Sequence, residues 1–123
     1  MSYIALLTNR FDDVVRFYGE DLGFSIVELW NRPNARGQRF DAGGLRLEIL
    51  DNERERHPLD LGEVANKVHI VIEVKDIDEA RERIAIDAPA PQDPSWGARL
   101  FQVHDPDRIP VTFLQWTKTS REK

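Results

Sequence analysis

Cysteine is absent from this 123-residue chain, which excludes disulfides, thiolate metal ligands and a cysteine nucleophile. No apolar run is long enough to cross a membrane, and no secretory signal precedes the first strand pattern. The motifs G-x-S-x-G and H-E-x-x-H and a glycine-rich phosphate loop are missing as well. These absences predict a cytoplasmic protein that is not bound to membranes and lacks those chemistries.

An excess of basic residues is also lacking. The chain has 17 Lys and Arg against 22 Asp and Glu, which gives a formal net charge of −5. A nucleic-acid surface needs clustered Lys and Arg, so this balance argues against nucleic acid as a partner and is compatible with a cationic small ligand. With 41% hydrophobic and 32% charged residues, the composition is that of one globular domain.

What the chain does contain is one pattern used twice. The stretches S-Y-I-A-L-L-T-N-R-F-D-D-V, from Ser2, and V-H-I-V-I-E-V-K-D-I-D-E-A, from Val68, each join an apolar strand to an acidic helix start. Their alignment places Tyr3 opposite His69. Literal identity is low, so the repeat is one of pattern, and it predicts two similar modules.

Each module is predicted to contain one helix. In the first, Asn9 is the candidate N-cap and Gly23 the stop, and the apolar stripe selects Tyr18 for the core, with Phe17 at its margin or facing a partner subunit. In the second, Asp76 begins a capping-box pattern. The predicted buried stripes are Phe11, Val14, Val15, Tyr18 and Leu22 in the first helix and Ile77, Ala80 and Ile84 in the second.

Strand patterns follow each helix, at residues 24–29, 38–42 and 45–50 in the first half and 99–104 and 111–116 in the second. Gly43-Gly44 and D-P-D-R are predicted turns, and Ala-Pro-Ala-Pro at 88–91 is predicted to replace part of a strand with a rigid loop. The prediction is therefore a single domain, 1–123. It has module one at 1–50, an exposed connection at 51–66, module two at 67–117 and a disordered tail at 118–123.

Two stretches carry a family resemblance. F-Y-G-E-D-L-G-F at 17–24 resembles the helix exit F-Y-x-x-x-L-G-F, and P-S-W-G-A-R-L-F-Q-V-H-D-P-D at 94–107 is similar to W-G-x-R-x-F-x-V-x-D-P-D-G. Both belong to the vicinal oxygen chelate superfamily (glyoxalases, bleomycin resistance proteins and dioxygenases), and the second is found especially in its bleomycin-resistance-like branch. Where that pattern commonly has Gly-Asn, this chain has Arg108-Ile109, so its last turn lacks the glycine.

The resemblance implies an α+β fold. Two βαβββ modules would form a curved mixed sheet around a cleft, with the helices on the outer face, often in a homodimer. Since successive side chains of a strand point to opposite faces, a helix-side row of Ile70, Ile72 and Val74 leaves His69 and Glu73 facing the cleft. The same parity, with Trp96 added from a loop as a stacking or covering ring, gives the predicted ligand-binding set Tyr3, Arg46, Glu48, His69, Glu73, Trp96, Gln102 and Thr112.

The resemblance also implies four metal-ligand positions, which in this chain are Tyr3, Glu48, His69 and Thr112. Only Glu48 and His69 have the expected residue types, whereas a catalytic divalent ion usually needs three protein ligands. We therefore predict no cofactor and no catalytic residues.

The leading hypothesis is a metal-free protein that binds a small molecule, for example to sequester an antibiotic or a metabolite. Its alternative is a metal-dependent lyase, isomerase or dioxygenase with a reduced ligand set for Zn, Ni, Mn or Fe. Two other readings stay open: an interaction module whose cleft is closed by its own dimer contacts, and a purely structural charge cluster of Arg46, Glu48, His69 and Glu73. The sequence also leaves open whether the modules pair within one chain or swap between subunits.

Overall fold

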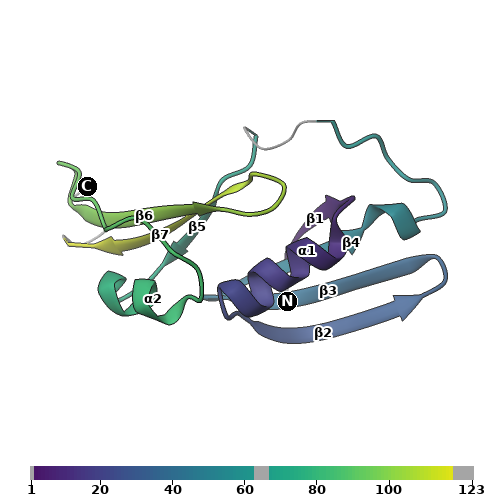
Figure 1. Ribbon diagram of the computed structural model, residues 1–123, viewed down its shortest axis with the longest axis horizontal. Coiled ribbons are helices and arrows are strands. Elements are labelled where there is room, and N and C mark those ends of the chain that lie inside the picture. The colour runs from purple at the N-terminus through teal and green to yellow at the C-terminus, as the bar shows by residue number, and fades with distance from the viewer. Residues whose placement is uncertain (1, 63–66, 118–123) are drawn as a thin grey trace.

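The computed structural model describes residues 2–62 and 67–117, so the predicted tail at 118–123 lies outside the described residues. The first half contains β1 (Ile4–Thr8), α1 (Phe11–Arg16), the π-helical turn η1 (Phe17–Asp21), β2 (Ser25–Arg32), β3 (Ala35–Ala42), β4 (Leu45–Asp51) and the 3₁₀ turn η2 (Asn52–Arg54) (Figure 1). The second half contains β5 (Ile70–Glu73), α2 (Ile77–Arg83), β6 (Ala98–His104) and β7 (Pro110–Trp116). No helix among the described residues is long and apolar enough to span a membrane.

The strands form two mixed sheets with matching topology. The order is β1-β4-β3-β2 in the first and β5-β7-β6 in the second, and each begins with a parallel pair, β1 with β4 and β5 with β7. This arrangement confirms the α+β class and the two related modules. The second sheet has one strand fewer, because Gln92 makes only an isolated bridge to Leu100 after the proline-rich loop. Proline has no N–H for a ladder, which is the reason the sequence predicted a loop there.

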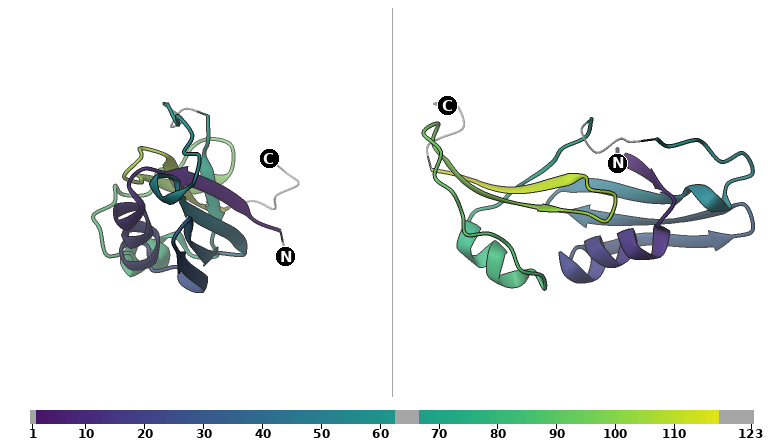
Figure 2. Two further views of the ribbon diagram at one scale, coloured as in Figure 1. Left: turned by 90° about the vertical axis from the view of Figure 1, so that its right-hand side faces the viewer. Right: turned by 45° about the horizontal axis from the view of Figure 1, so that its top comes forward.

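The two sheets lie end to end along the long axis of the molecule (Figure 1). Both helices cover the same side of the molecule, and the other face of each sheet carries no helix (Figure 2). The helix side holds the core, including Phe40, Leu47 and Ile49 of the first sheet and Phe101 and Val111 of the second. Glycine at both positions of the β3–β4 turn, with φ of 62° and 94°, allows the tight hairpin that connects two of these core strands.

The modules meet through the ends of their helices and strands. The hydroxyl of Tyr18 donates a hydrogen bond of 2.7 Å to Oδ2 of Asp105 in the β6–β7 turn. The rings of Phe24 and Phe113 pack with their centroids 6.4 Å apart, and the amide of Ala85 donates to the carbonyl of Asp21 at 2.7 Å. One continuous core therefore runs through both modules.

The start of α1 differs from the prediction. Arg10 occupies the N-cap position without a side-chain hydrogen bond, so the assignment of Asn9 as the cap is wrong. Asn9 instead accepts a 2.9 Å hydrogen bond from Nδ2 of Asn52. Asn52 is buried, although the connection that contains it was predicted to be exposed. Its side-chain amide donates to the carbonyl of Leu59 and accepts from the amide of Leu59, which holds the connection close to the end of β4. A tertiary contact thus outweighs the local cap. At the second helix, Asp76 caps as predicted, accepting from the amides of Asp78 and Glu79.

The end of the first helix corrects a second prediction. Phe17 was placed at the margin of the core, yet Phe17 and Tyr18 are both buried. Their rings meet edge to face with centroids 5.1 Å apart. The π-helical turn over Phe17–Asp21 changes the angular spacing of successive side chains, so two neighbours can share the core side. Gly23, with φ of 76°, ends the helix as predicted.

The alternation of the strands follows the prediction. Ile70 and Ile72 are buried on the helix side, as are Leu47 and Ile49. Ile4, also assigned to the helix side, lies opposite Leu47 on that side, yet 52% of its surface is exposed. Ile4 lies at the start of β1, which pairs with β4 alone among the described strands and is therefore an edge strand.

Candidate functional site

The open face of the first sheet contains a cavity of about 490 Å³. Its lining comes from the residue before β1 and from β2, β3 and β4, and consists of Tyr3, Glu28, Leu29, Trp30, Arg32, Arg39 and Glu48. Three aligned strands position these side chains, because Arg39 lies opposite Glu48 in the β3–β4 register and opposite Glu28 in the β2–β3 register. Same-face neighbours on adjacent strands are close enough to interact directly.

Arg39 is the centre of this group. Its Nε and Nη2 donate to Oε2 of Glu48 at 3.1 and 2.6 Å, and its Nη1 donates to Oε1 of Glu28 at 3.4 Å. The guanidinium carbon lies 4.3 Å from the ring centroid of Tyr3 and 5.7 Å from that of Trp30. The hydrogen bonds to Glu48 raise the pKa of Arg39 above its ordinary value, so the group stays charged. Glu48 is only 5% exposed, and this guanidinium compensates its buried charge.

The position of Trp30 depends on a glycine. Trp30 lies opposite Gly37 across the β2–β3 pair, and a Cβ at residue 37 would come within 2.3 Å of Cζ2 of the indole. A side chain there would therefore displace the ring. Gly37 leaves room for the indole to pack against β3, near the guanidinium of Arg39. The aromatic wall that Trp30 forms therefore depends on the lack of a side chain at Gly37.

The sequence interpretation missed Arg39, although the signal was present. Gly43-Gly44 was predicted as the hairpin turn, and the observed pairing of Ala42 with Leu45 follows from it. Counting outward from that turn places Arg39 opposite Glu48, on the same face. Side-chain parity within single strands was considered, but the cross-strand register was not, and only the register reveals the pair.

The open face of the second sheet presents a separate polar group. Nε2 of His69 lies 2.5 Å from Oγ1 of Thr112. Nε2 of Gln102 lies 3.0 Å from the same oxygen and 3.4 Å from the imidazole. The β5–β7 and β6–β7 registers account for this, since Thr112 faces Gln102 directly and Val71, two residues after His69, on the other side. Three predicted site residues are thus brought together.

Aromatic rings border this second face. Trp96 and Trp116 make an edge-to-face pair with centroids 5.6 Å apart, and Trp96 is exposed. Nε1 of Trp116 donates to Oε1 of Glu73 at 2.9 Å. Glu73 is thereby tied to the end of β7 and not to the imidazole of His69. A partly exposed indole pair on an open sheet face provides a surface on which a flat group can stack.

The residues of the predicted charge cluster, Arg46, Glu48, His69 and Glu73, are divided between the two sheets of the chain. Glu48 pairs with Arg39, whereas His69 and Glu73 have the partners described above on another sheet. Arg46 lies opposite Asp41 on the open face and does not line the cavity. The reason is topological: strands of different modules do not pair within the described chain, so their polar residues form two groups.

The four family metal positions are equivalent in the two modules. Glu48 lies opposite Ala5, and Thr112 lies opposite Val71, which follow Tyr3 and His69 by the same interval. The donors do not fit a divalent ion. Glu48 is held by a guanidinium that also covers the ring of Tyr3, and Thr112 is hydrogen-bonded as a neutral hydroxyl. Across the described residues, no three His, Cys, Asp or Glu side chains are grouped to hold a metal.

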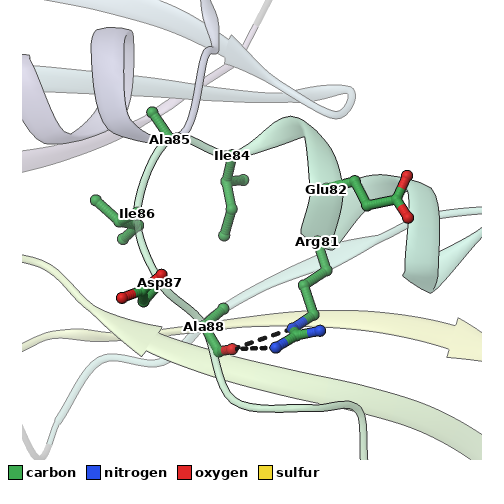
Figure 3. A pocket seen from close by; sticks show the side chains of 7 residues that line it. All are labelled: Arg81, Glu82, Ile84, Ala85, Ile86, Asp87 and Ala88. Atoms are coloured by element: carbon green, nitrogen blue, oxygen red, sulfur yellow. Dashed lines mark hydrogen bonds between the residues drawn. The ribbon is translucent and has the colours of Figure 1, made fainter.

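A second hollow, of about 270 Å³, lies in the loop that follows α2 (Figure 3). Nε and Nη2 of Arg81 both donate to the carbonyl of Ala88, at 3.0 and 2.8 Å. These bonds close the loop onto the helix that precedes it. Because both of these hydrogen bonds of the Arg81 guanidinium hold the loop closed, we interpret this hollow as part of a structural turn and not as a binding site.

Comparison with known proteins agrees with this geometry. The profile of the Glyoxalase/Bleomycin resistance protein/Dioxygenase superfamily matches residues 1–113. Among curated proteins, none matches the chain. A glyoxalase/bleomycin resistance protein/dioxygenase from Nocardioides has a TM-score of 0.72 at 23% identity, covering 97% of this chain and 84% of that one.

Two further structures have the same fold. A genomically encoded fosfomycin resistance protein from Listeria monocytogenes has a TM-score of 0.69 at 18% identity, with 99% of this chain and 95% of that chain covered. An antibiotic binding protein from Streptomyces sp. CB03234 has a TM-score of 0.66 at 17% identity, with coverages of 94% and 97%. The profile covers nearly the whole chain and the paired-module topology is the same, so the protein belongs to the Glyoxalase/Bleomycin resistance protein/Dioxygenase superfamily.

Proposed function

We propose that this protein binds a small molecule without a metal ion. The observation that carries the proposal is the ion pair of Arg39 with Glu48. In that pair, the one carboxylate among the family metal positions is already neutralised by a side chain of the same chain. A cavity with two aromatic walls remains beside it, which is the kind of site that small ligands use.

A second copy of the chain completes the site in this proposal. The edges of β1 and β5 are each unpaired on one side among the described strands. Tyr3, Ile4 and Val71 leave apolar surface exposed along these edges, and such edges are ready to pair. Pairing β1 of one copy with β5 of the other gives a two-fold homodimer. It brings the Arg39 group of one copy opposite the His69 group of the other.

A metal titration tests the first part of the proposal. Chelator-treated protein is heated with and without a modest excess of Zn²⁺, Ni²⁺ or Mn²⁺. We expect an unchanged melting temperature, because an ion that binds the folded state would raise it. A rise of several degrees that Glu48→Ala or His69→Ala abolishes would instead support a metal-dependent enzyme.

Fluorescence of 1-anilinonaphthalene-8-sulfonate tests whether the cavity on the first sheet binds a small molecule. We expect saturable enhancement with the folded protein, since the probe reports an accessible apolar wall. Trp30→Ala should weaken it because Trp30 lines the cavity. Leu59→Ala is the matched control, since Leu59 is an exposed apolar residue that does not line the cavity. Equal loss in both variants, or no saturable signal, contradicts small-molecule binding at this face.

A further inference from the structure

The guanidinium of Arg39 is fixed from several directions. Two N–H groups bind Glu48, one binds Glu28, and the plane is flanked by the rings of Tyr3 and Trp30. Each contact restricts a different motion of the side chain, so little conformational freedom remains to be lost on binding. Rigid, preorganised donors recognise a ligand with the smallest entropic cost.

The same group keeps donors in reserve. A guanidinium has five N–H groups, and the described residues accept hydrogen bonds from three of them. The side chain of Arg39 is 23% exposed and opens on the cavity. The remaining two N–H groups, one on each terminal nitrogen, are therefore within reach of a bound molecule. A charged donor of this kind prefers a negatively charged oxygen acceptor.

The cavity lining carries two carboxylates, Glu28 and Glu48, and two guanidinium groups, Arg32 and Arg39, so its formal charges balance and the sign it favours depends on which groups a ligand can reach. Glu48 is buried and its charge is compensated by Arg39. Glu28 is the opposing charge, but its side chain is 60% exposed and its contact with Arg39 is 3.4 Å long, so solvent weakens its effect. Arg32 supplies a second guanidinium on the cavity wall.

We propose that Arg39 is the ligand-recognising cation of this site and that it binds an oxyanion, such as a carboxylate, carried on a flat apolar body that lies against Trp30 and Tyr3. This inference rests on the proposed small-molecule binding and specifies the class of ligand. It also reverses the weak preference for a cationic ligand that the net charge of the chain suggested. The charged groups that a ligand can reach in the cavity, and not the net charge of the chain, decide the sign of the preferred ligand.

Isothermal titration calorimetry with two probes of equal shape and opposite charge tests the proposal. The probes are 2-naphthoate and 2-naphthylmethylammonium. We expect the wild-type protein to bind the carboxylate at least roughly tenfold more tightly than the ammonium, as a charge-assisted contact implies. Arg39→Met should remove this preference. Arg16→Met is the matched control: it deletes the same charge from an exposed side chain of α1 that does not line the cavity, and we expect it to change the affinity by less than about threefold.

Arg39→Met alone leaves the buried carboxylate of Glu48 without its partner and can unfold the chain. The double variant Arg39→Met with Glu48→Gln removes both charges, and in it the preference for 2-naphthoate should also be lost. Tighter binding of the ammonium, an unchanged preference in the double variant, or no binding of 2-naphthoate to the wild-type protein would each overturn the proposal. Saturable binding of the ammonium alone would do so while leaving small-molecule binding intact.

Discussion

At the scale of single residues, Tyr18 and Asp105 form the polar link inside the core. Burial, followed by the nearby charge of Asp105, raises the pKa of Tyr18 well above its ordinary value. Burial also raises the pKa of Asp105, although its hydrogen bonds with Tyr18 and with the amide of Ile109 oppose that shift. The phenol therefore keeps its proton in the folded state. The carboxylate it binds also orders the turn through the amides of Asp107 and Ile109.

Tyr18→Phe should change the response of the fold to alkaline pH. Above pH of about 10 the unfolded chain releases the phenolic proton while the folded chain retains it, so stability falls by about 1.4 kcal/mol per pH unit. The variant lacks this contribution, so its slope should be shallower by that amount, although at neutral pH it should be about 1.5–3 kcal/mol less stable. Urea unfolding at a series of pH values from 9 to 11 measures both. Parallel slopes for the two proteins would show that the phenol ionises in the folded state.

At the scale of elements, the β6–β7 turn reproduces a glycine conformation with another residue. Arg108 has a φ of 67°, in the left-handed region that side chains other than glycine rarely adopt. Its amide donates to the carbonyl of Asp105 at 2.8 Å, which holds the turn closed. The family pattern commonly has glycine here, so the turn keeps its shape at a local cost of about 1 kcal/mol.

Arg108→Gly should therefore be more stable than Arg108→Ala by about 1 kcal/mol, because only the alanine retains the steric cost. Comparing these two variants cancels the contacts of the arginine side chain, which both have lost. Urea unfolding at neutral pH measures the difference. Equal stability would mean that the turn relaxes to negative φ when the arginine is removed.

At the scale of the whole molecule, two sheets share one core but leave their open faces unconnected. Each face carries some of the polar residues of the predicted binding set. The proposed homodimer joins the faces through β1 and β5, so formation of the composite cleft depends on dimerisation. A monomeric variant should consequently lose the composite cleft and keep the core.

Ile4→Lys should separate the subunits, because it places a charge beside the β1 edge where pairing is proposed. Ile26→Lys is the matched control: both residues are isoleucines that are 52% exposed, but Ile26 lies on β2 at the other edge of the sheet. We expect light scattering at micromolar concentration to give twice the 14.3 kDa chain mass for the wild type and the control, and the single chain mass for Ile4→Lys. A wild-type mass of one chain contradicts the dimer.

Much of the secondary structure and of the core follows from local patterns in the sequence. Apolar periodicity predicted both helices and part of every strand, although β2 continues three residues further, to Arg32, and β3 begins three residues earlier, at Ala35. The capping-box pattern predicted the cap at Asp76, and two motifs predicted the paired-module fold that the family profile supports. These features are local, since they depend on side-chain spacing of a few residues along the chain. The same alternation also placed Glu48, His69 and Thr112 correctly on the open faces.

Which of these residues meet depends on contacts between segments that are distant in the sequence. Arg39 pairs with Glu48 across a hairpin, Gly37 makes room for Trp30 from the neighbouring strand, and Asn9 is drawn from its helix by Asn52. Each depends on the register of strands or on contacts distant in sequence, which side-chain spacing within one segment does not specify. The division of the candidate site between two sheets follows from the same cause. Periodicity assigns a residue to a face, and the pairing of strands decides what that face lies against.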